Sequence, residues 1–345
     1  MALMPEGSVF RDVLVPRYGE NRNLIGEMKV GTMTLLDSTR ARGENVSVQF
    51  FHDDLSPRGI VNLKNAFYYF EESRLFADEA VKIMTDRLLA HGSGLVYSFQ
   101  NGEGFLRGPA DTRISSPRPA PFMNVKPPIA ASLLGLWLAP APLIAHPHPD
   151  AKKESEGISK AAFTFLESSG MKVDFSKQPE PKLLEISPSA SDTVITCEGG
   201  MYFDADKGVL VYLKDVQVSD PRFALKGAQQ LKVFFEKKEA KPEKKSSSAM
   251  GSFGDVRKII AEGAVVIDQK SVDGKEPIQA SGRELIYDIQ SKEITISGGF
   301  PWVKQGTYYA RAKQADLSMR ILESGSFSTK GPWEVGGTLE QKKPD

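Results

Sequence analysis

Cysteine and histidine are scarce in this chain of 345 residues, which has one cysteine, Cys197, and four histidines. A single thiol excludes an internal disulfide framework and any all-cysteine zinc or iron–sulfur site made by one chain. The closely spaced histidines His146 and His148 lie in a proline-rich stretch and read as the polar flank of an apolar segment. The sequence therefore predicts no metal site and no cofactor.

Neither sign of charge is in excess, because 44 Lys and Arg residues balance 44 Asp and Glu residues. Without a basic excess, nucleic acid is not predicted as a partner. The hydrolase motifs Gly-x-Ser-x-Gly and His-Glu-x-x-His are also missing. Paired carboxylates such as Asp204 and Asp206 stand at turns, where aspartate is favoured for its local hydrogen bonds. No catalytic residue is predicted, and a carbohydrate-active β-fold enzyme with two distant carboxylates stays open as an alternative.

One long uncharged run interrupts the chain at residues 127–149. Prolines at 140 and 142 leave only the part before them free for a helix, which is marginal against the roughly 20 residues that a bilayer core requires. A basic residue, an apolar core and a small-residue end give 123–145 the layout of a secretory signal, and a packed proline-rich linker is the other interpretation. The residues expected to associate with a membrane are Leu133, Leu134, Leu136, Trp137 and Leu138.

Elsewhere apolar side chains recur with a period of two. Between residues 209 and 235 such runs are separated by turn residues at 219–221 and 226–227. Short alternating strands with this punctuation predict a mainly β fold, either a sandwich, a barrel or a roll. Apolar residues at helical spacing predict one short helix at 154–168. The lysine- and glutamate-rich stretch 236–252 cannot bury enough apolar surface to order itself and is predicted to be a disordered loop.

One short phrase, Ala-x-Gly-x-x-aliphatic, recurs along the chain. Copies begin at Ala41, Ala90, Ala261 and Ala280, and a looser copy begins at Cys197. The small residue and the glycine let the chain turn tightly into a strand whose aliphatic and aromatic side chains enter a shared interior. One such unit cannot bury its apolar face alone, so the repeats predict that neighbouring units stack into a continuous roll.

These residues resemble the OstA-like family of lipopolysaccharide-transport proteins. In residues 199–225 an aromatic-Asp pair, an aliphatic strand, a valine strand and Asp220-Pro221-Arg222-Phe223 follow the order of the family repeat, and residues 15–24 resemble a strand-opening phrase of its LptC branch. The resemblance implies β-jellyroll modules built from short antiparallel strands. The expected division is an LptC-like domain at 8–118, the apolar segment at 119–153, a helix and linker at 154–190, an LptA/OstA-like domain at 191–330 and a polar tail at 331–345.

The resemblance also implies a function. Two splayed sheets would shelter the acyl chains of lipopolysaccharide, and each methylene removed from water stabilises binding by about 0.8 kcal/mol. The protein would carry lipopolysaccharide without catalysis across the periplasm, at the inner membrane, as part of a bridge between the two membranes. Edge-strand addition would join it to an inner-membrane transporter, an outer-membrane translocon or a second copy. The residues expected to line the groove are Phe203, Val211, Leu213, Val216, Val218, Phe223, Leu225, Leu231, Val233, Leu285, Tyr287, Ile289, Ile294 and Ile296.

A structural alternative uses the same residues. Period two does not say which face of each strand points inward, and an ordinary sandwich core has the same pattern. In that case the chain would be a structural or adhesive envelope protein whose repeats merely stack. The two interpretations differ in the interior, which must leave room for acyl chains only if the protein carries lipid.

Overall fold

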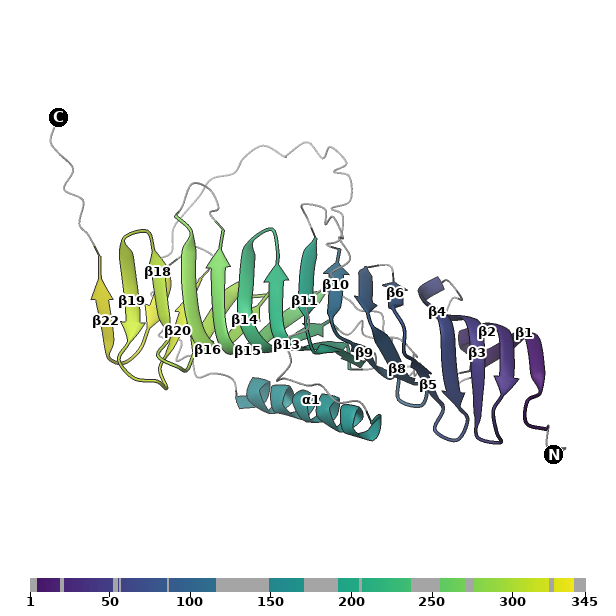
Figure 1. Ribbon diagram of the computed structural model, residues 1–345. Helices are drawn as coiled ribbons and strands as arrows, with labels where there is room; N and C mark the ends of the chain where they lie inside the picture. Colours follow the sequence, from purple (N-terminus) through teal and green to yellow (C-terminus); the bar gives the residue numbers. More distant parts are fainter. Residues whose placement is uncertain are drawn as a thin grey trace, which may run out of the picture.

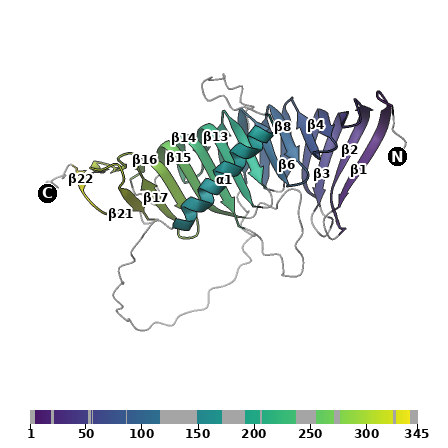
Figure 2. The same ribbon diagram turned by 90° about the horizontal axis from the view of Figure 1, so that it is seen from below.

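The computed structural model describes residues 5–18, 22–51, 55, 57–85, 87–115, 149–170, 192–204, 207–236, 255–270, 276–322 and 326–337. These residues form one antiparallel sheet of 22 strands and one helix, α1 (Pro149–Ser168). Figures 1 and 2 show a long roll with the first and last strands at opposite ends and α1 lying along one side. The mainly β, antiparallel fold predicted from the sequence is confirmed.

The strands fall into two groups along the chain. Those before α1 are β1 (Val9–Tyr18), β2 (Leu24–Leu35), β3 (Arg40–Phe51), β4 (Pro57–Tyr69), β5 (Arg74–Ala77), β6 (Val81–Thr85), β7 (Leu88–Gly92), β8 (Gly94–Ser98), β9 (Glu103–Arg107) and β10 (Ala110–Ile114). Those after it are β11 (Thr193–Cys197), β12 (Gly200–Asp204), β13 (Val209–Ser219), β14 (Phe223–Phe235), β15 (Val256–Gln269), β16 (Ile278–Asp288), β17 (Glu293–Ser297), β18 (Trp302–Gln305), β19 (Tyr308–Ala312), β20 (Ser318–Ile321), β21 (Phe327–Thr329) and β22 (Trp333–Gly336).

The sheet folds over into two walls that share its long strands. In β4, residues 59–62 pair with β6 and residues 67–69 pair with β5. β13 divides in the same way between β12 and β11, and β16 divides between β17 and β18. We call the wall with β5, β8, β9, β12, β17 and β20 the helix-side wall, because α1 covers it. The opposite wall contains β6, β7, β10, β11, β18 and β19. β9 pairs with β12 and β10 with β11, so both walls run unbroken from one strand group to the other.

Every copy of the repeated phrase lies where the chain passes from one wall to the other. Ala41, Ala90, Ala261, Ala280 and Cys197 are all buried at this fold line. The glycine that follows is needed there for space: a Cβ on Gly282 would overlap the side chain of Ile296 and approach the Ser297 carbonyl oxygen to 3.1 Å. Gly263, with φ of 133°, occupies a conformation that favours glycine outright. The tight turn predicted for this phrase is thus the crossing between walls.

Two apolar layers hold the roll together. The larger fills the space between the walls, with side chains from every long strand. The smaller lies on the outside of the helix-side wall, where Ile158, Ala162, Phe165 and Leu166 of α1 pack on outward-facing residues of β8, β9 and β12–β15. The spacing of these helical residues puts them on one face. Ser155 and Lys232 fix the register of α1 on the wall through a buried hydrogen bond of 2.5 Å between Oγ and Nζ.

Three predicted boundaries need correction. The helix begins at Pro149 rather than at residue 154, since proline is favoured in the first turn, where its missing N–H costs no hydrogen bond. Residues 226–227 are not a turn between strands: β14 is continuous, and Gly227 (φ of 80°) lies in a β-bulge. The predicted polar tail contains β22, because Trp333 packs on the core and β22 pairs with β19.

Two predicted segments lie outside the described residues. The membrane-associated candidates Leu133, Leu134, Leu136, Trp137 and Leu138 belong to 116–148, and the loop predicted at 236–252 is described only at Glu236. Within the described part of the chain, no helix combines the length and the apolar character that a membrane crossing requires.

Candidate functional site

The interior of the roll collects most of the predicted lining residues. They come from both walls of the C-terminal strand group, and their side chains are buried in one apolar cluster: Phe203, Val216, Val218, Phe223, Leu225, Leu231, Val233, Leu285, Tyr287, Ile294 and Ile296. Ile289 is partly buried and packs against the same cluster. The residues therefore share one interior, and there they pack on one another.

Val211 and Leu213 were predicted to line this interior, and the structure places them on the other face. Both side chains lie in the layer between the helix-side wall and α1. Their neighbours Leu210 and Tyr212 point inward instead. The reason is that residues 209–213 are apolar on both faces, so alternation with polar residues gives no direction. An apolar run of this kind indicates a strand covered on both sides.

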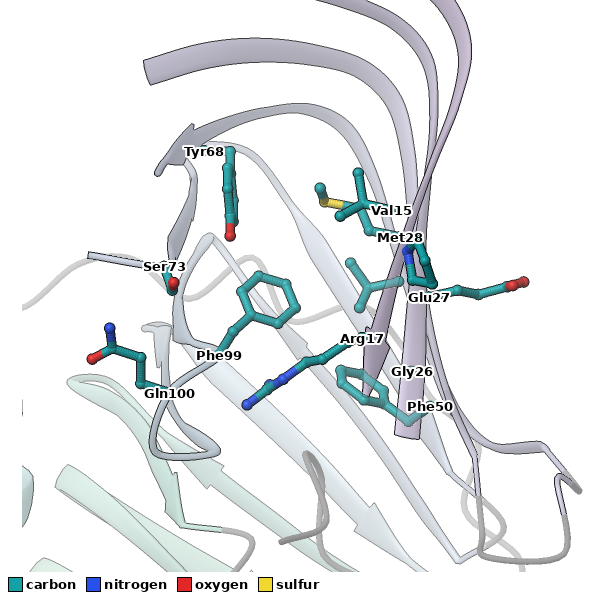
Figure 3. Close-up of a pocket in the computed structure, with 12 residues that line it drawn as sticks. Val15, Arg17, Gly26, Glu27, Met28, Phe50, Tyr68, Ser73, Phe99 and Gln100 are labelled. Carbon is teal, nitrogen blue, oxygen red and sulfur yellow. The ribbon is translucent and has the colours of Figure 1, made fainter. Parts of the chain in front are cut away.

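The hollow part of the interior lies in the N-terminal strand group, which the sequence analysis did not single out. A pocket of about 250 Å³ opens between the opposite wall and the loops at the free ends of the helix-side wall. Figure 3 shows it between β1–β3 on one side and Tyr68, Ser73, Phe99 and Gln100 on the other. The further lining residues are Val15, Pro16, Arg17, Gly26, Glu27, Met28, Val48 and Phe50.

A second, much smaller cavity of about 10 Å³ continues this pocket inward. It shares Val48 and Phe50 with the pocket and reaches Phe203 in the C-terminal strand group. Aromatic rings follow the same path: Phe99 lies 4.9 Å from Tyr97 between ring centroids, and Tyr97 stacks on Phe203 at 6.0 Å. Apolar and aromatic side chains therefore extend from the pocket to the junction of the two strand groups.

Opposite the fold line, the free ends of the two walls meet along a line that we call the seam, defined by the pairs Arg17/Phe99, Arg87/Asp255 and Arg222/Tyr287. Arg87 Nη1 lies 2.6 Å from Asp255 Oδ1. The guanidinium carbon of Arg222 lies 5.8 Å from the Tyr287 ring centroid, and Phe223 meets the same ring edge-on. These are side-chain contacts between walls, so they can separate without breaking a strand.

At the seam, Asp220 is a buried carboxyl that accepts hydrogen bonds from its neighbours. Burial alone would raise the pKa of this carboxyl, but hydrogen bonds from Arg222 and Thr193 outweigh it and lower the pKa below its usual value. Arg222 Nε donates to Asp220 Oδ1 at 2.8 Å, so the charged carboxylate also holds the guanidinium against Tyr287. Burial raises the pKa of the Cys197 thiol to about 12, which keeps it protonated and unreactive.

Chemistry-bearing groups elsewhere have structural partners. Asp204 accepts hydrogen bonds from the backbone N–H and the Nζ of Lys207 at 2.8 and 2.6 Å, which is the turn role predicted for it. Lys232 is buried beneath α1, where its Nζ donates a hydrogen bond to Ser155 Oγ of the helix and pairs with Glu262 at 2.6 Å. Among the described residues no group of three His, Cys, Asp or Glu side chains could hold a metal ion.

Comparison with known proteins finds partial likenesses among solved structures alone. No protein-family model and no curated protein matches the sequence. Among solved structures, the chain is similar to LptH of Pseudomonas aeruginosa, described as the LptA-homologous periplasmic component of the lipopolysaccharide transport device. The likeness covers 43% of this chain and 95% of LptH, with 13% sequence identity and a TM-score of 0.33. So low a TM-score supports no inference about function.

Proposed function

We propose that this protein binds the acyl chains of an amphiphile of the lipopolysaccharide type between the two walls of its roll, and carries the molecule without catalysis. The observation that supports this most directly is the open pocket of about 250 Å³, whose apolar lining continues through Val48 and Phe50 toward Phe203. Because this pocket lies between the two walls, an acyl chain that enters it would point into the interior of the roll.

Entry beyond the pocket requires the walls to separate. The C-terminal interior is filled by its own side chains, and Arg222 and Phe223 meet Tyr287 across the seam there. An exposed ion pair such as Arg87–Asp255, whose carboxylate is 60% exposed, contributes about 0–1 kcal/mol. Each acyl methylene that replaces water contact with apolar contact contributes about 0.8 kcal/mol. A few methylenes therefore offset the loss of one seam contact.

Transport between membranes would use the two ends of the roll. Among the described strands, β1 pairs only with β2, and β22 pairs only with β19. Both end strands carry exposed apolar residues, with Val9 59% and Val335 70% exposed. Unpaired edges of this kind accept a further strand. Strand addition there would join the roll to an inner-membrane transporter, an outer-membrane translocon or a second copy, and would place the protein in the periplasm.

Two adjacent aromatic residues provide the test. Phe203 points into the interior at the small cavity, whereas Tyr202 points outward beneath α1. Photoreactive p-benzoylphenylalanine at either position replaces one aromatic ring by another. After irradiation with lipopolysaccharide, we expect a lipid adduct at position 203 and little at position 202, read by mass spectrometry. Circular dichroism checks that both variants are folded.

A structural envelope protein is the second candidate, and the packed C-terminal interior favours it. If the repeats only stack, lipopolysaccharide has no access to position 203. Folded protein with no adduct at 203, or with equal adducts at 202 and 203, would reject lipid carriage and leave the structural role.

A further inference from the structure

Three arginines of the opposite wall reach across the seam, one after another along the roll. Arg17 belongs to β1, Arg87 lies just before β7, and Arg222 lies just before β14. The guanidinium carbon of Arg17 lies 5.4 Å from the ring centroid of Phe99. Figure 3 shows Arg17 extending from β1 across the pocket toward Phe99 and Gln100. The line along which the walls would part therefore carries three arginines, of which Arg87 pairs with Asp255 and Arg222 pairs with Asp220.

Two of these arginines each have a buried N–H group that could donate a further hydrogen bond. Arg17 Nη1 and Arg87 Nε are buried and lack a hydrogen-bond partner within the described part of the chain. A buried charged donor without a partner is unfavourable, because it has lost its hydrogen bonds to water. A guanidinium does not escape this cost by losing its proton, because its pKa is too high. Such donors are suited to an acceptor that arrives with a ligand.

The surroundings of Arg17 favour an anionic ligand group. Glu27 lines the same pocket, but its carboxylate pairs with Lys29 Nζ at 2.7 Å, which offsets its charge. The rest of the lining is largely apolar, including Val15, Met28 and Phe99. An apolar pocket with one cation at its opening is complementary to a molecule with a fatty chain and an anionic end.

The size of the pocket limits what it holds. At about 250 Å³ it is smaller than the roughly 300–1,000 Å³ of pockets that enclose a drug-sized ligand. A whole multi-chain lipid does not fit, so its chains must continue into the interior while its polar end stays at the seam. Arg17 is the arginine nearest to that opening.

We propose that the arginine-lined seam recognises the anionic head group of the bound amphiphile, with Arg17 making the first contact. This inference rests on the proposed function, because the chains must lie between the walls for the head group to meet the seam. Arg87 would take over the same group further along the roll, exchanging Asp255 for the anion.

The test separates charge recognition from packing. Arg17→Met keeps an unbranched stem on Phe99 and removes the charge. Arg42→Met is the control, because Arg42 is an exposed arginine of β3 outside the seam. Binding of bis-phosphorylated lipid A and of the same lipid after dephosphorylation is measured for the full chain. We expect Arg17→Met to weaken binding of the phosphorylated lipid about tenfold or more, as loss of a charge-assisted hydrogen bond predicts. Binding of the dephosphorylated lipid should hardly change, and Arg42→Met should affect neither.

The other outcomes overturn the inference in distinguishable ways. Equal weakening for both lipids would show that Arg17 only shapes the pocket. Undiminished binding of the phosphorylated lipid would exclude Arg17 as a contact. Saturable binding of inorganic phosphate alone, with no preference between the lipids, would make the seam a free-anion site. In each of these cases an adduct at position 203 would still support lipid carriage. Wild-type protein that binds neither lipid would reject the proposed function together with the inference.

Discussion

The two strand groups are built alike and differ in how their interiors are filled. In both, long strands cross between walls, and the same Ala-x-Gly phrase marks the crossing. In the C-terminal group, Phe223 and Tyr287 meet across the seam and close it. In the N-terminal group, the corresponding gap between β1–β3 and the loops at Ser73 and Phe99 stays open as the pocket. Side chains, and not the course of the backbone, therefore decide where this roll is hollow.

Truncation of one phenylalanine in each group should give the largest effect on stability, and it tests the difference in packing between the two interiors. Phe223 is buried in the closed interior, whereas Phe99 is partly buried and borders the pocket. Phe223→Ala should lower the free energy of unfolding by about 3–5 kcal/mol, because it leaves a cavity in packed surroundings. Phe99→Ala should cost less, since part of its surface already faces open space, and should widen the pocket. Urea unfolding of both variants compares the two values. Equal losses would contradict the difference in packing.

A substitution at the junction between the two strand groups should have a second, smaller effect on stability. Gly104 of β9 lies opposite Phe203 of β12, and a Cβ at position 104 would overlap the ring of Phe203. Gly104→Ala should therefore displace Phe203 and destabilise the fold by about 1–3 kcal/mol, as overpacking does. The double variant Gly104→Ala/Phe203→Leu should recover part of the loss, because the smaller side chain makes room. Two losses that simply add in urea unfolding would show that the two residues do not interact.

The sequence predicts the type of fold better than the direction of its side chains. Period two and the repeated phrase were enough for a mainly β roll, since alternation and tight crossings are local properties. At Val211 and Leu213 alternation failed because α1 makes the outer face apolar too. The apolar run 209–213 indicates that both faces of the strand are covered, but it does not say which of its residues point inward. The pocket was missed for a related reason: it depends on gaps between Phe50, Tyr68 and Phe99, which packing in three dimensions creates. Arg17 carried no sequence signal of its own, because it is distinguished by a buried Nη1 that has no hydrogen-bond partner among the described residues, and packing in three dimensions creates that property.

Acid should lower the stability of the C-terminal strand group through Asp220. This is the smallest of the three expected effects on the free energy of unfolding. Because the folded protein lowers the pKa of this carboxyl, its contribution is fully present above the unfolded value of about 3.9 and is lost as pH falls through the folded value. Asp220→Asn should lower the free energy of unfolding near pH 6 by about 1 kcal/mol, the usual net contribution of a hydrogen bond. The difference between the variant and the wild type should shrink as pH falls from about 5 toward 2, because the wild-type carboxyl then becomes neutral as well.

The N-terminal group contains a counterpart for this experiment. Hydrogen bonds from Thr39 and Arg40 lower the pKa of Asp37 to about 2, but Asp37 caps the exposed turn between β2 and β3 and lies away from the seam. Both Asp37→Asn and Asp220→Asn should flatten the dependence of stability on pH. Only Asp220→Asn should also release Arg222 from Tyr287, and a change in the near-ultraviolet circular dichroism of that variant alone would report it. The same spectral change in both variants would mean that Asp220 stabilises a turn and does not hold the seam closed.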